Sequence, residues 1–227
     1  MWLKTYIEDI TVMYGISSAE AQNVIIETAE QFYTHLLRHP VVCEMTKDSI
    51  AIRKYSFNAF AVSEDTVTLQ SHDFKSLSAS LKDRFETIML CRKHKYLSAY
   101  IGKAIRCTFL KYDDGAFCCT EDGGAGKIHA VCSDRNIPPK ERNRYSSGQN
   151  LWFIASGLIQ KNDQILFRLS RTSMTLVDEL FKLNGSSVRC IKRISGVKSY
   201  VHAEKHIPKK QIMSVATELN ERIIVEF

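Results

Sequence analysis

The chain has 227 residues, 44% of them apolar and 25% charged, which is enough for one large domain or two to three small ones. No apolar run approaches the roughly 20 residues that cross a bilayer, so we expect no membrane contact. Acidic residues interrupt the apolar N-terminal stretch, which is untypical of a secretory signal. These features predict a cytoplasmic protein.

Charge is divided unevenly along the chain. Residues 1–90 hold 8 Lys and Arg against 12 Asp and Glu, whereas residues 91–227 hold 23 against 13. The net charges are therefore −4 and +10. This asymmetry favours an acidic partner such as nucleic acid for the second part, and a different kind of partner for the first.

Residues 1–100 are predicted to form an α/β module that ends in a long helix. Ser17, with Glu20 three residues later, is typical of a capping box before a helix that ends near Pro40. Two β-rich segments follow, at 49–62 and 66–71, with a turn expected at 63–65. A long helix is then expected from a cap at Asp73 to Gly102, with an apolar stripe along one face.

Residues 101–172 are predicted to form a five-stranded OB-type β-barrel. The short alternating segments KAIRCTFLKY, AFCCT, KIHAVCS, LWFIASGLIQ and QILFRLS are separated by turn signals and one long basic connection. Residues 173–227 then read helix, strand, strand, helix, strand, which is most of a KH-like α/β unit. Thr172 or Ser173 is expected to cap its first helix. The predicted fold class is α+β and multidomain.

Three patterns that resemble catalytic or metal sites do not fit their motifs. GGAGK (123–127) has Glu121 where a P-loop requires Gly and Ile128 where it requires Ser or Thr, so a hairpin turn is favoured. HAEKH (202–206) has its Glu displaced from the zinc-peptidase spacing. The seven cysteines contain no Cys-x-x-Cys pair, so we expect reduced thiols. We therefore predict no catalytic residue, metal or cofactor, and no enzymatic activity.

Basic residues interleaved with aromatics on the barrel strands are the strongest functional signal. If Cys118 faces the core, Phe117 faces outward, where a base could stack on it. Basic side chains on nearby strands and loops, and at the start of the last helix, could contact phosphates. The candidate RNA-binding residues are Tyr112, Phe117, Lys127, His129, Arg135, Arg142, Arg144, Arg168, Arg193, Lys198, Lys209 and Lys210.

Four motifs lie at the junction of the predicted barrel and the C-terminal unit: IP…Y..G (137–148), LSRT (169–172), LV..LF.L (176–183) and IKRISGVKSYV (191–201). Together they resemble the bacterial NusA family of transcription factors, at the junction of its RNA-binding barrel and first KH domain. The resemblance is good over about residues 101–203 and weaker to 227, and residues 1–100 agree in layout. It implies that residues 1–100 bind RNA polymerase core and that residues 101–227 bind single-stranded or nascent RNA, modulating pausing, termination or antitermination.

The sequence departs from that family in its last part. One KH-like unit is present instead of two, and EKHIPKKQ (204–211) stands where a Gly-x-x-Gly loop would clamp the RNA backbone. Without those glycines we expect this truncated unit to be mainly structural, with the barrel as the principal RNA site. The alternative is a free-standing RNA-binding protein that acts in translation or RNA chaperoning without polymerase contact.

Overall fold

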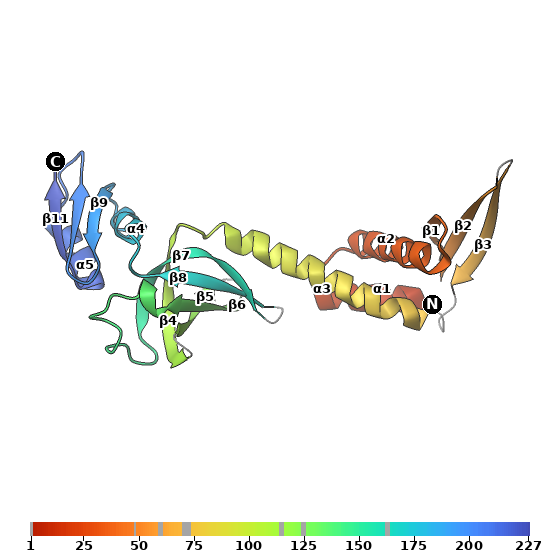
Figure 1. Cartoon of the computed structure of the whole chain (residues 1–227), viewed down its shortest axis with the longest axis horizontal. Helices are drawn as coiled ribbons and strands as arrows, with labels where there is room; N and C mark the ends of the chain where they lie inside the picture. The colour runs from red at the N-terminus through yellow and green to blue at the C-terminus, as the bar shows by residue number, and fades with distance from the viewer. Residues whose placement is uncertain are drawn as a thin grey trace. The chain divides into compact units, whose positions relative to one another are not determined.

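The computed structural model describes residues 2–47, 49–58, 61–69, 74–113, 116–123, 126–161 and 164–227. These residues form a mixed α+β protein with five α-helices and a closed five-stranded β-barrel (Figure 1). The chain divides into two compact units, residues 1–91 and 92–227. Helix α3 (Phe74–Ser98) contains the boundary between them.

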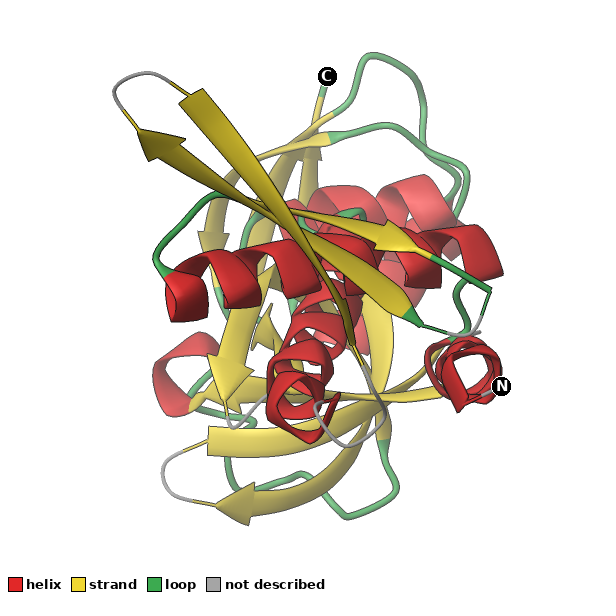
Figure 2. Ribbon diagram, turned by 90° about the vertical axis from the view of Figure 1, so that its right-hand side faces the viewer, coloured by secondary structure: helices red, strands yellow, loops and turns green. Residues whose placement is uncertain are grey.

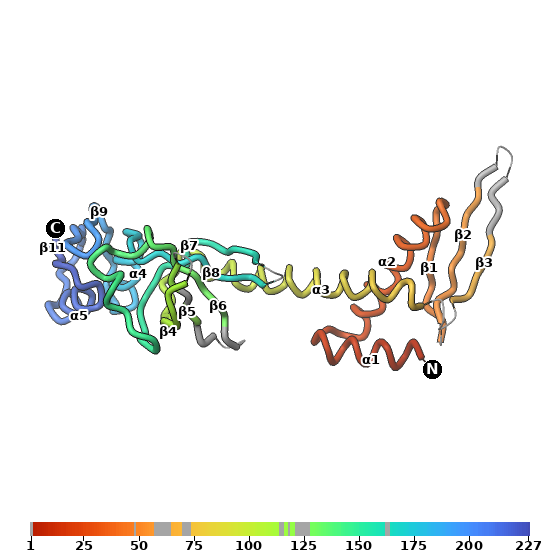
Figure 3. Tube along the Cα trace, turned by 60° about the horizontal axis from the view of Figure 1, so that its bottom comes forward, coloured from red at the N-terminus to blue at the C-terminus, as the bar shows by residue number. Residues whose placement is uncertain are grey.

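The first unit combines three helices with a small antiparallel sheet. Helices α1 (Trp2–Tyr14) and α2 (Ser18–Leu37) precede strands β1 (Val41–Met45), β2 (Ile50–Asn58) and β3 (Ala61–Leu69), which pair in that order. Figure 3 shows the paired trace of the three strands. The Ser17 hydroxyl accepts a hydrogen bond from the Glu20 amide at 3.2 Å, which confirms the predicted helix cap.

The predicted stripe of α3 is confirmed, but one turn was misplaced. Phe74, Leu77, Leu81 and Phe85 are all buried in the core of the first unit. The turn expected at 63–65 is wrong, because Glu64 lies inside β3 and pairs with Tyr55 of β2. The expected cap at Asp73 lies outside the described residues.

The barrel comprises β4 (Ala104–Asp113), β5 (Ala116–Gly123), β6 (Gly126–Ser133), β7 (Asn150–Lys161) and β8 (Gln164–Ser170), closed in the order β4-β5-β6-β8-β7. This arrangement confirms the five predicted strands and is compatible with an OB fold. Pairing of β5 with β6 continues to Gly123 opposite Gly126, so the described ends of the stretch GGAGK lie on two paired antiparallel strands, as expected for a hairpin. Residues 124 and 125 lie outside the described residues. Strands β6 and β8 pair in parallel and close the barrel. The connection 134–149, which joins β6 to β7, begins with the 3-10 helix η1 (Asp134–Asn136).

The C-terminal part consists of α4 (Thr175–Leu183), β9 (Arg189–Ile194), β10 (Lys198–His202), α5 (Lys209–Leu219) and β11 (Arg222–Glu226). Its sheet has the order β11-β10-β9, with β10 parallel to β11 and antiparallel to β9. Helices and strands are distinguished by colour in Figure 2. Gly196 takes the positive φ of +76° that the β9–β10 turn requires. The expected Thr172 or Ser173 cap is wrong, because Met174 occupies the cap position of α4 without a side-chain hydrogen bond.

Candidate nucleic-acid interface

Phe117 is a core residue, so the prediction that it faces solvent is wrong. It is 2% exposed, and its ring centroid lies 5.6 Å from that of Phe109 and 5.5 Å from that of Tyr145. Cys119, on the same face of β5, is also buried. Both phases of this strand offer apolar side chains, and burying a phenyl ring removes more apolar surface from water than burying a thiol. The strand therefore turns Phe117 inward.

Tyr112 is the aromatic side chain that this end of the barrel presents to solvent. It is 52% exposed, and its ring centroid lies 4.9 Å from that of Phe117 in an edge-to-face arrangement. Partial desolvation, followed by the carboxylate of Asp134, raises the pKa of Tyr112, and Arg142 opposes that shift. Tyr112, Asp134 and Arg142 are thus brought together from β4, η1 and the long connection.

The remaining barrel candidates are scattered over several elements. His129 on β6, Arg135 in η1, Arg144 in the connection and Arg168 on β8 are exposed. Arg168 lies over the bulge of β7, with its Nε 3.8 Å from the position that a Cβ on Gly157 would occupy. The side chain of Lys127 lies outside the described residues. The exposed cations are available to a polyanion, although they do not form one compact cluster.

A buried ionic junction joins the barrel to the C-terminal part. Arg171, directly after β8, is 2% exposed and donates from Nε to Glu141 at 2.6 Å and from Nη1 to Glu218 of α5 at 3.0 Å. The same Nη1 also donates to the Trp152 carbonyl at 2.9 Å, and Tyr145 donates its hydroxyl to Glu141. Burial opposes the charged form of Arg171, but Tyr145 and the two carboxylates outweigh it and raise its pKa.

The sequence reasoning missed this junction, although Arg171 and Tyr145 both lie in motifs that carry the family resemblance. Beside it is a cavity of about 710 Å³ lined by Tyr145, Trp152, Arg144 and Lys210, among others. Two of the predicted RNA contacts, Arg144 and Lys210, are therefore brought to one cavity from the connection and from α5. Lys209, next to Lys210 at the start of α5, is exposed.

Arg193 is a structural residue, which corrects its assignment as an RNA contact. Its side chain is 1% exposed and pairs with Glu221, 0% exposed, at 2.7 Å. Glu221 also accepts from the Gly196 amide and the Ser199 hydroxyl. A guanidinium held this way fastens the β9–β10 turn to the segment between α5 and β11, and it cannot reach a phosphate.

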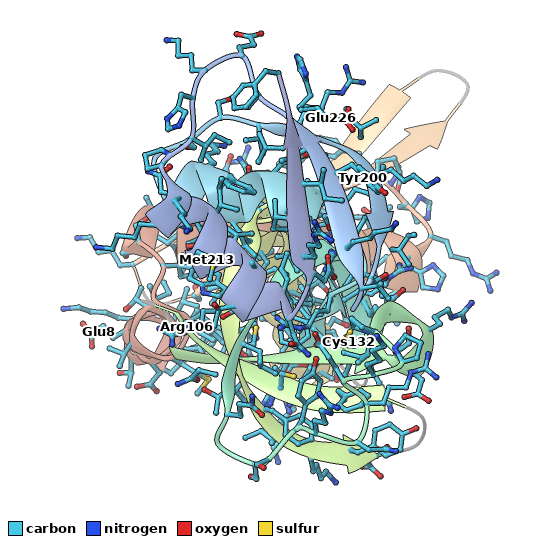
Figure 4. All side chains as sticks on the ribbon, turned by 90° about the vertical axis from the view of Figure 1, so that its left-hand side faces the viewer. Glu8, Arg106, Cys132, Tyr200, Met213 and Glu226 are labelled. Atoms are coloured by element: carbon cyan, nitrogen blue, oxygen red, sulfur yellow. The ribbon has the colours of Figure 1, made fainter. Side chains whose placement is uncertain are left out.

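Lys198 differs from Arg193 because it points to the opposite face of the sheet. Its ammonium lies 5.3 Å from the centroid of the Tyr200 ring on the same strand. Figure 4 shows Tyr200 and Glu226 on the C-terminal sheet and Met213 on α5. Lys198 is thus part of a mixed basic and aromatic surface on that sheet.

The cysteines and helices add no further site in the described part of the chain. Six cysteines have described side chains, none of these six forms a disulfide, and among them only Cys91 is exposed. Among the described residues, no group of three or more His, Cys, Asp or Glu could hold a metal ion. Likewise, no described helix is long and apolar enough to span a bilayer.

No protein-family model matches the chain, and a search of curated proteins finds no significant match.

Proposed function

We propose that this chain is a NusA-like transcription factor, in which residues 92–227 bind single-stranded RNA and the first unit contacts RNA polymerase core. The observation that carries the proposal is a closed five-stranded barrel, fastened by the Arg171 junction to an α–β–β–α–β unit. Junction residues Tyr145 and Arg171 come from the motifs that resemble the family. The C-terminal part is, in this proposal, a KH-like unit without a Gly-x-x-Gly loop.

The charge of the second unit supports an RNA partner. Residues 92–227 carry a net charge of +10, and exposed arginines lie in η1, the connection and β8. A surface of this kind attracts a polyanion and releases its counterions on binding. Exposed Tyr112, close to Arg142, supplies a ring on which a base could stack.

The first unit has a different surface, which supports a protein partner. Its net charge is −4, and α1 exposes two adjacent apolar side chains, Val12 at 85% and Met13 at 71%. Contiguous exposed apolar side chains mark protein-docking sites, and we infer that Val12 and Met13 belong to one. The acidic unit is poorly suited to nucleic acid, whose phosphates it would repel.

Two measurements on the full chain test the proposal. Fluorescence anisotropy with a labelled single-stranded RNA should show affinity that falls about 50-fold between 50 and 200 mM salt, if about four phosphates are contacted. Gel filtration with bacterial core RNA polymerase should show co-elution, which Val12→Asp with Met13→Asp abolishes without weakening RNA binding. Leu183→Asp, at an exposed apolar position of α4, is the matched control and should still co-elute.

The outcomes separate the two halves of the proposal. RNA binding without co-elution would refute the polymerase contact and favour a free-standing RNA-binding protein, which the separate core of the second unit could support. Absence of RNA binding at 50 mM salt would refute the RNA-binding function itself.

A further inference from the structure

The C-terminal sheet has one face covered by helices and one face open. Val201 and Cys190 point to the covered side and pack in a core with Leu180 of α4 and Val215 of α5. Side chains alternate along a strand, so the residues next to Val201 on β10 point the other way. The opposite face therefore carries Tyr200 at its centre, with Lys198 and His202 on the same strand.

Cross-strand pairing defines the neighbours of Tyr200 on this open face. Tyr200 lies opposite Lys192 of β9 and Ile224 of β11. Two residues before Tyr200, Lys198 lies opposite Ile194 of β9 and Arg222 of β11. Two residues after it, His202 lies opposite Arg189 of β9 and Glu226 of β11. The cross-strand neighbours of the ring are thus cations and aliphatic side chains, and Ile191, at the irregularity of β9 beside Lys192, is also exposed.

The charge of this surface selects a polyanion. Arg189, Lys192, Lys198 and Arg222 share this face with one acid, Glu226, and Asp178 of α4 interacts electrostatically with Arg189. Within the described part of the chain, none of these four cations belongs to an ion pair. Ile191, Ile194 and Val197 on β9 and the turn after it are also exposed. A protein partner that covered them would still have to desolvate four charges, whereas phosphates would neutralise those charges.

The ring adds a preference for unpaired bases. Lys198 and Tyr200 are both half-buried, so part of the ring is open to a ligand. A nucleobase stacks on such a ring as strongly as an ammonium binds over it, or more strongly. A base could therefore replace the Lys198 ammonium over Tyr200, and the freed ammonium could reach the adjacent phosphate. Adjacent strands lie about 4.8 Å apart, so the cations of β9 and β11 are within reach of the same strand of nucleic acid.

We propose that this open sheet face is a second binding surface for single-stranded RNA, with Tyr200 stacking one base and the four cations contacting its backbone. The inference rests on the proposed RNA-binding function and adds a site that is distinct from the barrel and from the start of α5. It also assigns the C-terminal part a direct role in binding, where the sequence alone predicted a mainly structural one.

The test uses the full chain, a fluorescein-labelled single-stranded RNA and anisotropy at 50 to 200 mM salt. Tyr200→Ala should weaken binding about tenfold, and Tyr200→Phe, which keeps the ring, should restore most of the affinity. Lys192→Glu should weaken binding and reduce the steepness of its salt dependence. Lys75→Glu makes the same charge change at an exposed position of α3 in the first unit, and should change neither.

The failures of the two proposals are distinguishable. If the unaltered chain binds RNA and Tyr112→Ala weakens it, but Tyr200→Ala and Lys192→Glu do not, the sheet-face site is refuted and the barrel remains. If the unaltered chain binds no RNA at 50 mM salt, the RNA-binding function fails and the inference falls with it. If sedimentation shows that Tyr200→Ala breaks up an oligomer without changing RNA affinity, the face joins copies of the chain and the inference is overturned.

Discussion

Replacing Arg171 by Met removes the guanidinium from the cluster that it forms with Glu141, Tyr145 and Glu218. The Met side chain fills most of the volume that the Arg side chain occupied. Glu141, 5% exposed, would keep the Tyr145 hydroxyl as a donor but lose its counter-charge. Glu218 is partly exposed, so water can replace its lost partner. Breaking one side of a buried ion pair costs about 3–5 kcal/mol. Since only Glu141 stays fully buried, we expect about 3 kcal/mol.

Urea unfolding measures this loss directly. In a Trp2→Phe background, fluorescence reports Trp152 alone, whose carbonyl accepts from Arg171. For a unit of this size, 3 kcal/mol corresponds to a melting temperature lowered by about 10 °C. Arg168→Met, at an exposed arginine of β8, is the matched control and should change stability by less than about 0.5 kcal/mol.

Glu141→Gln in the Arg171→Met background should rescue part of this loss. A neutral amide at this buried position has no charge that would be left without a partner. A loss below about 1 kcal/mol in Arg171→Met, or the absence of any rescue, would refute the buried ionic junction.

Three further predictions concern the barrel, two turns and one thiol. Phe117→Ala should lower the free energy of unfolding of the second unit by about 3–5 kcal/mol in urea unfolding. Tyr112→Ala should change that free energy by less than about 0.5 kcal/mol and should weaken RNA binding. Equal stabilities of the two variants would contradict the inward orientation of Phe117 on β5. Gly196→Ala should lower the melting temperature more than Gly148→Ala, because both have positive φ but only the new Cβ at Gly196 would meet Pro138, at 3.2 Å. Burial, and then a nearby carboxylate, raises the pKa of Cys43 to about 12, so thiolate is scarce at pH 8 and mass spectrometry should find this thiol alkylated in urea but not in the native protein.

Local patterns in the sequence predicted those elements that local chemistry determines. The five barrel strands alternate clearly and are bounded by turn residues, and Ser17 precedes its helix with the expected cap. Gly196 has a positive φ in the β9–β10 turn, a backbone conformation that glycine adopts more easily than any other residue. Strand β1 was not predicted, because five residues between a helix end and a turn carry too short a pattern.

Features that depend on pairing between distant segments could not be predicted in the same way. Arg171 finds one carboxylate 30 residues before it and another 47 residues after it. Arg193 looked like a surface cation, and only the fold places Glu221 beside it. The open face around Tyr200 likewise appears only when the register of three strands is known. The phase of Phe117 was misjudged because both faces of its strand are apolar enough to be buried.

The separation of Arg171 from its partners also has a consequence for the order in which the protein is made. All five barrel strands and Glu141 have been synthesised by the time Ser170 is added, so the barrel can close with Arg171 held by one carboxylate. Glu218 is added 47 residues later, which takes about 2–10 s at ribosomal rates of about 5–20 residues per second. During that interval the growing chain contains all five barrel strands and an Arg171 with only one of its two carboxylate partners, and α5 can dock only after Glu218 has been added.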